Sequence, residues 1–180
     1  MNTFSKTIAY IISIPARIKG MKFGEGSFIG PGYDLKPKLK GVILGDNVIV
    51  GKGAWFDISL YTKNAKIIIG KGTNVGRFSM MSAAKKITIG EKCLLSHNIS
   101  ILDHDHNVFD LDKSPLDSGI TVPQEIVIGD HCFIGAHSFI LKGVHLGKHC
   151  VVGANSVVNQ SFQDYSVVGG SPAKLIRILK

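Results

Sequence analysis

The chain has 180 residues, of which 44% are hydrophobic and 19% charged, and its formal net charge is +8. This length suits one domain with a sizeable core, and the balance of apolar and charged residues excludes an intrinsically disordered protein. The positive charge favours anionic partners such as phosphate-bearing ligands, nucleic acid or anionic lipid, although surplus charge also serves solubility alone.

The first segment, residues 1–22, is predicted to be amphipathic. Its apolar run from Ile8 to Ile14 ends at Pro15, and it is far shorter than the ~20 residues that a membrane-spanning helix needs. No small-x-small cleavage site follows, which disfavours a signal peptide. We expect this segment to pack on its own domain or to make peripheral contact with a membrane surface, and we expect the protein to be cytoplasmic.

From Phe23 onward the dominant pattern is a period of six residues. An aliphatic residue followed by Gly recurs, with a small residue three positions after the Gly, as in "IGKGTNVGRFSM" from Ile69 and "IGDHCFIGAHSF" from Ile128. The first and fifth residues of each hexad share one side of a strand, and the Gly, Asp, Asn and Lys between them suit turns with positive φ. Three six-residue faces close a coil of eighteen, which is the step from Ile128 to Leu146. The sequence therefore predicts an all-β fold, a parallel β-helix of triangular cross-section over residues 23–158.

Cysteines and several histidines have fixed places in this register. Cys93, Cys132 and Cys150 take the fifth slot of their hexads, so we expect free thiols buried in the core rather than a disulfide or a zinc ribbon. Three histidines take the fourth slot, at a turn, and should form an outward-facing ladder at a corner: His131, His137 and His149.

The longest break in the repeat is an excursion over about residues 103–124. It begins with "ILDHDHNVFDLDKSP", which places His104 and His106 among several aspartates. A long loop that a regular solenoid does not need is usually functional or disordered. The residues alone leave three interpretations: a metal site, a catalytic base with supporting carboxylates, or a polar surface loop.

The tail, residues 159–180, carries turn and charge signals. Ser171 and Pro172 are typical of the N-cap and first residue of a helix, so a short C-terminal helix with basic residues near its end is expected. These basic residues either approach an anionic ligand or merely cap the solenoid.

The hexads, the histidine-bearing loop and the tail "YSVVGGSPAKLIRIL" together resemble the hexapeptide-repeat acyltransferases. The subgroup is that of galactoside, maltose and nodulation-type acetyltransferases and of capsule or lipopolysaccharide O-acetyltransferases. The resemblance implies a left-handed β-helix, a homotrimer, and acetyl-CoA as co-substrate in the groove between adjacent subunits. It implies transfer of an acetyl group to a hydroxyl of a sugar or polysaccharide precursor, directly and with a histidine as general base.

The resemblance also implies roles for individual residues. It places the base at His106, with His104 as second choice, because a neutral imidazole can take a proton from the attacking hydroxyl. Asp103 or Asp105 would orient the imidazole. Six positions are implied near acetyl-CoA: Ala136 and Ala154 beside the thioester and pantetheine arm, Asn159 and Gln160 where relatives have Thr-Lys, and Lys174 and Arg177 toward the nucleotide.

Other functions are compatible with parts of the sequence. An N-acetyltransferase of an amino sugar, or an antibiotic acetyltransferase, would use the same scaffold. A metal enzyme like the γ-carbonic anhydrases needs three histidine ligands, and no two histidines here have the five-residue spacing of that family, although His104, His106 and Asp103 could share a metal. A binding module for nucleic acid is disfavoured, because the basic residues are scattered and no aromatic stacking platform is apparent.

Overall fold

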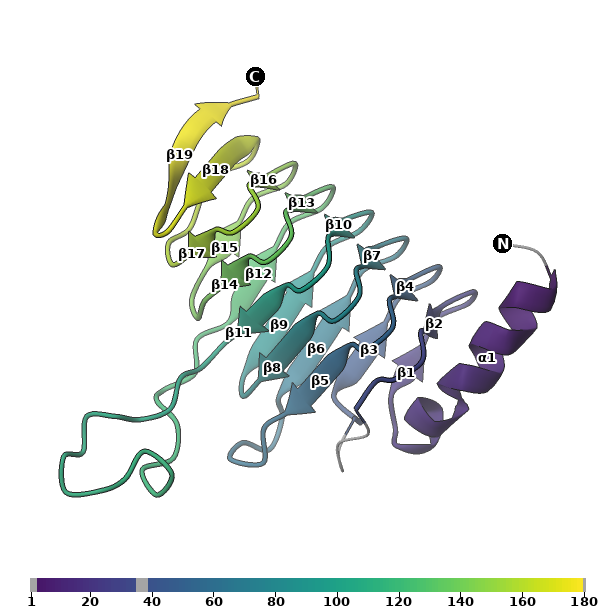
Figure 1. Ribbon diagram of the computed structural model, residues 1–180, viewed down its shortest axis with the longest axis horizontal. Helices are drawn as coiled ribbons and strands as arrows, with labels where there is room; N and C mark the ends of the chain where they lie inside the picture. The colour runs from purple at the N-terminus through teal and green to yellow at the C-terminus, as the bar shows by residue number, and fades with distance from the viewer. Residues whose placement is uncertain (1–2, 35–38, 180) are drawn as a thin grey trace.

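The structure, a computed structural model, describes residues 3–34 and 39–179. Within these residues the chain forms one helix followed by short strands that wind into a solenoid of three parallel sheets (Figure 1). Sheet A contains, in spatial order, β1 (Lys22–Phe23), β3 (Val42–Leu44), β6 (Lys66–Ile69), β9 (Lys86–Ile89), β12 (Ile126–Ile128) and β15 (His145–Leu146).

Sheets B and C complete the triangle. Sheet B runs from β2 (Phe28–Ile29) through β4 (Ile49–Val50), β7 (Asn74–Val75), β10 (Leu94–Leu95), β13 (Phe133–Ile134) and β16 (Val151–Val152) to β18 (Ser166–Gly170) and β19 (Ala173–Ile178). Sheet C contains β5 (Trp55–Ile58), β8 (Met80–Ala83), β11 (Ser100–Leu102), β14 (Phe139–Ile140) and β17 (Val157–Val158). The predicted all-β parallel β-helix is confirmed.

The core follows the hexad register. Ile67, Ile87 and Ile126 are partners in adjacent strands of sheet A, and each is completely buried. The same stacking recurs along the other two sheets, so that each coil covers the apolar residues of the coil before it. Burial of aliphatic side chains, at about 25 cal/mol per Å² of apolar surface, is therefore the main stabilising term of the fold.

The second-slot glycines are required for a different reason from the one expected. Positive φ is found at the fourth slot, for example at Asn47 (φ 55°) and His131 (φ 59°). At the second slot the neighbouring coil approaches too closely for a side chain: a Cβ on Gly76 would lie 2.3 Å from the carbonyl oxygen of Ser96. Glycine at this slot therefore permits the close stacking of coils, while the fourth slot makes the turn.

This difference gives a testable stability effect. Replacing Gly76 with alanine should lower the free energy of unfolding by about 1–3 kcal/mol, because the added methyl group forces two backbones apart. Gly153→Ala is the matched control, since a Cβ there would meet its nearest neighbour at an ordinary 3.5 Å. Urea unfolding of both variants measures the effect, and equal midpoints would contradict this account of the second slot.

The predicted places of the cysteines are confirmed, and the predicted ladder is confirmed for His131 and His149, whereas His137 does not stack with them. All three thiols are free and buried, and hydrogen bonds with Cys150 and Cys93, together with burial, raise the pKa of Cys132. The ring of His149 stacks on those of His131 and Tyr165 at centroid distances of 4.8 and 5.2 Å, on the surface of the solenoid. His137 meets His97 edge to face at 5.0 Å.

The predicted C-terminal helix is wrong. Residues Ser171 and Pro172 form the turn of an antiparallel hairpin, in which β19 pairs with β18. β18 in turn adds to the free edge of β16 as the next parallel strand. The sheet edge supplies pairing partners along most of β19, with one irregularity at Ile176, whereas a helix of that length would be marginal on its own. Tertiary pairing thus overrides the local capping signal.

The N-terminal segment forms α1 (Thr3–Ile18), which covers the first coil of the solenoid (Figure 1). The N–H of Ile29 in β2 donates a hydrogen bond to Ser13 Oγ at 3.1 Å, and the hydroxyl of Tyr33 donates to the carbonyl of Ile12 at 2.7 Å. Among the described residues, no helix has the length and apolar character needed to cross a membrane.

Candidate functional site

The excursion leaves the solenoid after β11 and returns before β12, and it projects away from the body of the molecule (Figure 1). Its two arms are joined by backbone hydrogen bonds: Gln124 N–H donates to the carbonyl of Asp103 at 2.9 Å, and Thr121 N–H to that of Asp105 at 2.8 Å. The tip exposes large apolar side chains, among them Phe109 and Leu111. We call the two hydrogen-bonded arms the stem of the excursion. The stem is therefore a fixed support, while the tip presents an apolar surface.

Asp103 is the most constrained carboxylate of the stem. It is completely buried. It accepts three backbone hydrogen bonds of 2.7 Å from the link after β8 and the start of β9: Ala84 N–H to Oδ1, and Lys85 and Lys86 N–H to Oδ2. Hydrogen bonds of this kind compensate the loss of water around a buried charge. The carboxylate is therefore held in one orientation.

His104 is the side chain that this carboxylate orients. Its Nδ1 lies 2.8 Å from Asp103 Oδ1, and its side chain is only 14% exposed. Because an ionised carboxylate can only accept, Nδ1 carries the hydrogen and the lone pair of the neutral ring is on Nε2. His104 is thus set up as a proton acceptor with a fixed tautomer.

His106 and Asp105, the other two candidate residues of the excursion, have different surroundings from His104 and Asp103. His106 is exposed, and its backbone forms an isolated bridge with Ile120; no side-chain hydrogen bond joins it to another described residue. The Asp105 carboxylate pairs with Lys142 Nζ at 2.6 Å. Of the two carboxylates that the sequence offered as orienting groups, Asp103 is the one that contacts an imidazole.

Both histidines line one cavity of about 760 Å³ on sheet C. Its walls come from β5 and the segment that follows it, β8, the end of β11 and the excursion: Trp55, Asp57, Ser59, Leu60, Tyr61, Met80, Ser82, Leu102, His104, Asp105, His106 and Ile120. The mixture of aromatic, apolar and a few polar groups is typical of a small-molecule site.

Sequence reasoning missed the residues from the earlier coils. Asp57, Ser82 and Leu102 occupy paired positions in β5, β8 and β11, and Ser82 Oγ donates to Asp57 Oδ2 at 3.1 Å. Trp55 Nε1 donates to Asp34 Oδ2 at 3.0 Å. Asp57 could be found from the sequence by stepping back from Leu102 one coil at a time, through the paired position Ser82. The irregular segment after β5 changes the length of that coil, so the hexads alone do not give this alignment.

The six positions implied for acetyl-CoA lie elsewhere. Ala136 and Ala154 share a corner between sheets B and C, and the carbonyl of Ala136 accepts the N–H of Asn155 at 2.9 Å. The side chain of Gln160, next to the exposed Asn159, donates to the carbonyl of Ala173 at 3.2 Å. Lys174 and Arg177 are exposed on β19. None of the six lines the cavity that holds the histidines.

The described part of the chain offers no matching set of ligands for a metal centre. Within residues 3–34 and 39–179, no group of three or more His, Cys, Asp and Glu side chains is arranged to hold a metal ion. Asp103, the carboxylate that the sequence grouped with His104 and His106, is occupied by three N–H donors and one imidazole.

Comparison with known proteins agrees with the repeat and the fold. Residues 125–160 match the family model described as the hexapeptide repeat of succinyl-transferase. A mutant of AntD, an N-acyltransferase from Bacillus cereus solved with dTDP and coenzyme A, superposes with a TM-score of 0.75 at 18% identity, covering 91% of this chain and 87% of AntD. A galactoside acetyltransferase in complex with coenzyme A gives a TM-score of 0.62 at 22% identity, covering 86% of this chain and 65% of that one. The chain therefore shares the fold of these proteins, and residues 125–160 carry a hexapeptide repeat.

Curated relatives connect this class with acyl transfer. The chain is 43% identical over 91 residues to a Dictyostelium discoideum protein assigned as an acetyltransferase, and 28% identical over 152 residues to one from Mycobacterium tuberculosis. These matches span 51% and 83% of this chain, but only 46% and 49% of the relatives, about half of their length. WbbJ of Escherichia coli, assigned as an O-acetyltransferase of lipopolysaccharide biosynthesis, is 29% identical over 93% of this chain and 78% of its own. The resemblance to the hexapeptide-repeat acyltransferases is confirmed.

Proposed function

We propose that the chain is an acetyl-CoA-dependent O-acetyltransferase that acts on a hydroxyl of a sugar or polysaccharide precursor. The observation that carries this proposal is the Asp103–His104 pair, a buried carboxylate and an oriented imidazole at the wall of a cavity. The similarity to WbbJ along most of both chains supports the hydroxyl acceptor. A cytoplasmic location belongs to the same proposal.

His104 acts as the general base. Its Nε2 takes the proton of the acceptor hydroxyl as that oxygen attacks the thioester carbonyl of acetyl-CoA, and the C–S bond then breaks. The thiolate leaves as coenzyme A and takes the proton back from His104, so the imidazole is regenerated. Asp103 holds the tautomer and stabilises the imidazolium in between. The contacts favour His104 over His106, which was preferred from the sequence, because only the former has an orienting partner among the described residues.

A homotrimer is part of this proposal. Within one chain, the residues implied for acetyl-CoA binding and the two histidines lie on different parts of the solenoid. A groove between adjacent subunits would bring the acetyl-CoA-binding residues of one chain to the histidine of its neighbour. The exposed apolar tip of the excursion, including Phe109 and Leu111, offers a surface for such a contact. Ala136, with its backbone N–H, remains the candidate that faces the thioester oxygen.

The donor site can be tested on β19. Lys174→Ala and Arg177→Ala should each raise KM for acetyl-CoA by about 2- to 5-fold and leave kcat nearly unchanged, because exposed charge pairs with phosphate contribute modestly. Lys71→Ala, at an exposed corner of the solenoid, is the control. Initial rates at varied acetyl-CoA measure both constants, and an unchanged KM in both variants would remove β19 from the donor site.

Amine acceptors are the second candidate function. The AntD structures are of N-acyltransferases, and the same base would serve an amino group. Thiol release from acetyl-CoA over a panel of sugars, amino sugars and nucleotide-linked sugars distinguishes the two. Turnover confined to amino sugars would replace the O-acetyltransferase proposal by this one, and no turnover with any acceptor would contradict both.

A further inference from the structure

The helix α1 is apolar on both of its sides. Small residues face the solenoid: Ala9, Ser13 and Ala16 are buried against the first coil. The large aliphatic residues face outward instead, with Ile11 56% and Ile18 79% exposed. A helix that only capped the solenoid would carry polar residues on its outer side.

The outward side chains form one stripe. Ile8, Ile11, Ile14 and Ile18 recur three or four residues apart, so they lie along a single face of the helix, and Tyr10 flanks them at 57% exposure. We call these five residues the outer stripe. An exposed run of this kind marks a surface that is covered by a partner or a membrane.

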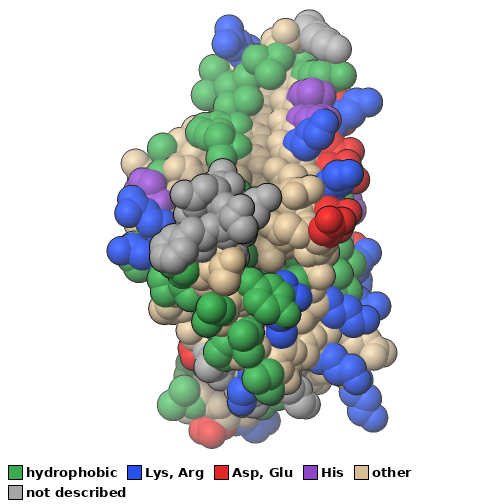
Figure 2. Space-filling view, turned by 90° about the vertical axis from the view of Figure 1, so that its right-hand side faces the viewer, with side chains coloured by type: hydrophobic (Ala, Val, Ile, Leu, Met, Phe, Trp, Pro, Cys, Tyr) green, Lys and Arg blue, Asp and Glu red, His purple; other side chains and the backbone are tan. Residues whose placement is uncertain are grey.

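The surroundings of the stripe are basic. Residues 7–24 contain Arg17, Lys19 and Lys22 and no acidic residue. The view of the molecule from the side of α1 shows hydrophobic side chains with Lys and Arg around them (Figure 2). A second copy of this chain would bring the same positive charge against this face, whereas anionic lipid would neutralise it.

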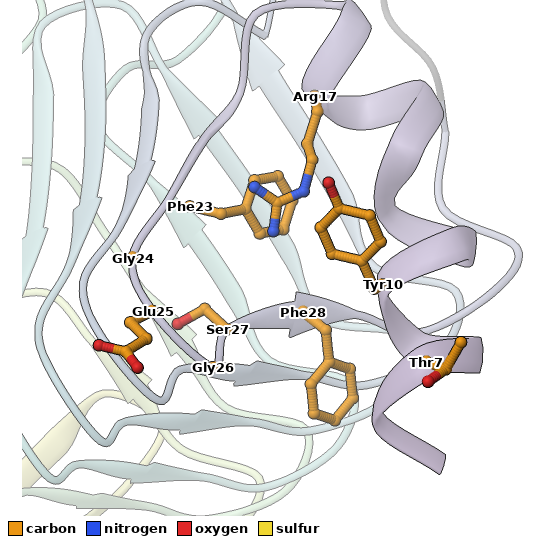
Figure 3. Close-up of a pocket in the computed structure, with 9 residues that line it drawn as sticks. All are labelled: Thr7, Tyr10, Arg17, Phe23, Gly24, Glu25, Gly26, Ser27 and Phe28. Atoms are coloured by element: carbon orange, nitrogen blue, oxygen red, sulfur yellow. The ribbon is translucent and has the colours of Figure 1, made fainter. Parts of the chain in front are cut away.

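Two hollows add cationic groups near this end of the molecule. Four lysines and no acidic residue line one of about 690 Å³: Lys22, Lys40, Lys63 and Lys66. None of its lining residues belongs to α1, but Lys40 lies against Gly20, two residues after the helix ends. In the other hollow the Arg17 guanidinium lies between the rings of Phe23 and Tyr10, 4.1 and 5.0 Å from their centroids (Figure 3). Glu25 lines this hollow too, so its charge is mixed. The hollow lined by four lysines suits the phosphate of a lipid headgroup.

We propose that the outer stripe of α1 docks the protein on an anionic lipid surface. The isoleucines enter the boundary between headgroups and acyl chains, with the helix lying in the plane of the membrane, and the surrounding lysines and Arg17 contact phosphates. Tyr10, with an apolar ring and a polar tip, suits that boundary. The inner face of α1 stays packed on β2, so docking requires no unfolding of the cap.

Vesicle flotation tests the proposal with the full chain. Wild type should bind vesicles of phosphatidylcholine with about 30 mol% phosphatidylglycerol and bind pure phosphatidylcholine much more weakly. Ile11→Ser and Ile18→Ser should each weaken binding by about tenfold. The double variant Lys19→Gln/Lys22→Gln should weaken it by a comparable factor, and high salt should do the same.

Matched controls separate docking from general stickiness. Ile176→Ser removes a 66% exposed isoleucine from β19 at the other end of the solenoid, and Lys71→Gln/Lys92→Gln removes two exposed lysines at a corner; both should bind like wild type. Wild type that stays off anionic vesicles, or stripe variants that bind unchanged, would overturn the proposal. Stripe variants that lower the mass in light scattering, with no vesicle binding by wild type, would instead assign the stripe to contacts between copies.

Discussion

His104→Ala should lower kcat for acetyl transfer by about 10²- to 10⁴-fold, the usual contribution of a general base. KM for acetyl-CoA should change little, because the residues proposed to hold the donor lie outside the cavity of His104. Asp103 fixes the tautomer of this imidazole through a contact of 2.8 Å between Oδ1 and His104 Nδ1. Removal of the imidazole therefore leaves the acceptor hydroxyl without a base. Initial rates of thiol release from acetyl-CoA measure the effect.

His106→Ala is the matched control. This imidazole lines the same cavity but is exposed, so its removal should change KM for the acceptor rather than reduce kcat by orders of magnitude. The reverse pattern, a large loss in His106→Ala with an active His104→Ala, would assign the base to His106. Circular dichroism of both variants shows whether the fold is kept.

Asp103→Asn should reduce both stability and kcat. The carboxylate accepts three backbone N–H groups and the imidazole N–H, whereas an amide has one oxygen and turns its NH₂ toward donors in either orientation. Each buried donor that is left unsatisfied costs about 1–3 kcal/mol. The free energy of unfolding should therefore fall by at least that amount. Urea unfolding and initial rates measure the two effects.

One matched control serves both effects of Asp103→Asn. Asp117→Asn changes an exposed carboxylate of the excursion and should alter neither quantity. If Asp103 positions His104, kcat should fall under conditions where the variant is fully folded, while KM for acetyl-CoA stays near its wild-type value. A folded variant with wild-type kcat would leave Asp103 only a structural role and contradict its part in the mechanism.

The solenoid could be predicted from the sequence because its information is local and repeated. Each hexad specifies the same inward positions, and pairs such as Ile87 and Ile126 stack because the register is conserved from coil to coil. The tail could not be predicted in this way, since β19 is a strand only because β18 offers it an edge. The capping signal at Ser171 and Pro172 is local, and the pairing that overrides it is not.

The sequence predicts which stretch of chain holds the candidate site, but not the geometry of that site. The break in the repeat shows where the excursion lies, and the two histidines in it indicate general-base chemistry. What distinguishes His104 from His106 is a carboxylate anchored by the N–H groups of Ala84 to Lys86, one coil earlier in the solenoid. Asp57 enters the cavity from yet another coil. Contacts between coils depend on exact register across irregular turns, which the hexads alone do not specify.

One measurement tests the central claim most directly: the rate of thiol release from acetyl-CoA, with and without sugar acceptors, by wild type and His104→Ala. The account predicts release that depends on an acceptor, formation of an acetylated sugar, and a rate about 10²-fold or more lower in the variant. A His104→Ala protein that works at the wild-type rate would contradict it, as would an acetylated wild-type enzyme that accumulates without acceptor.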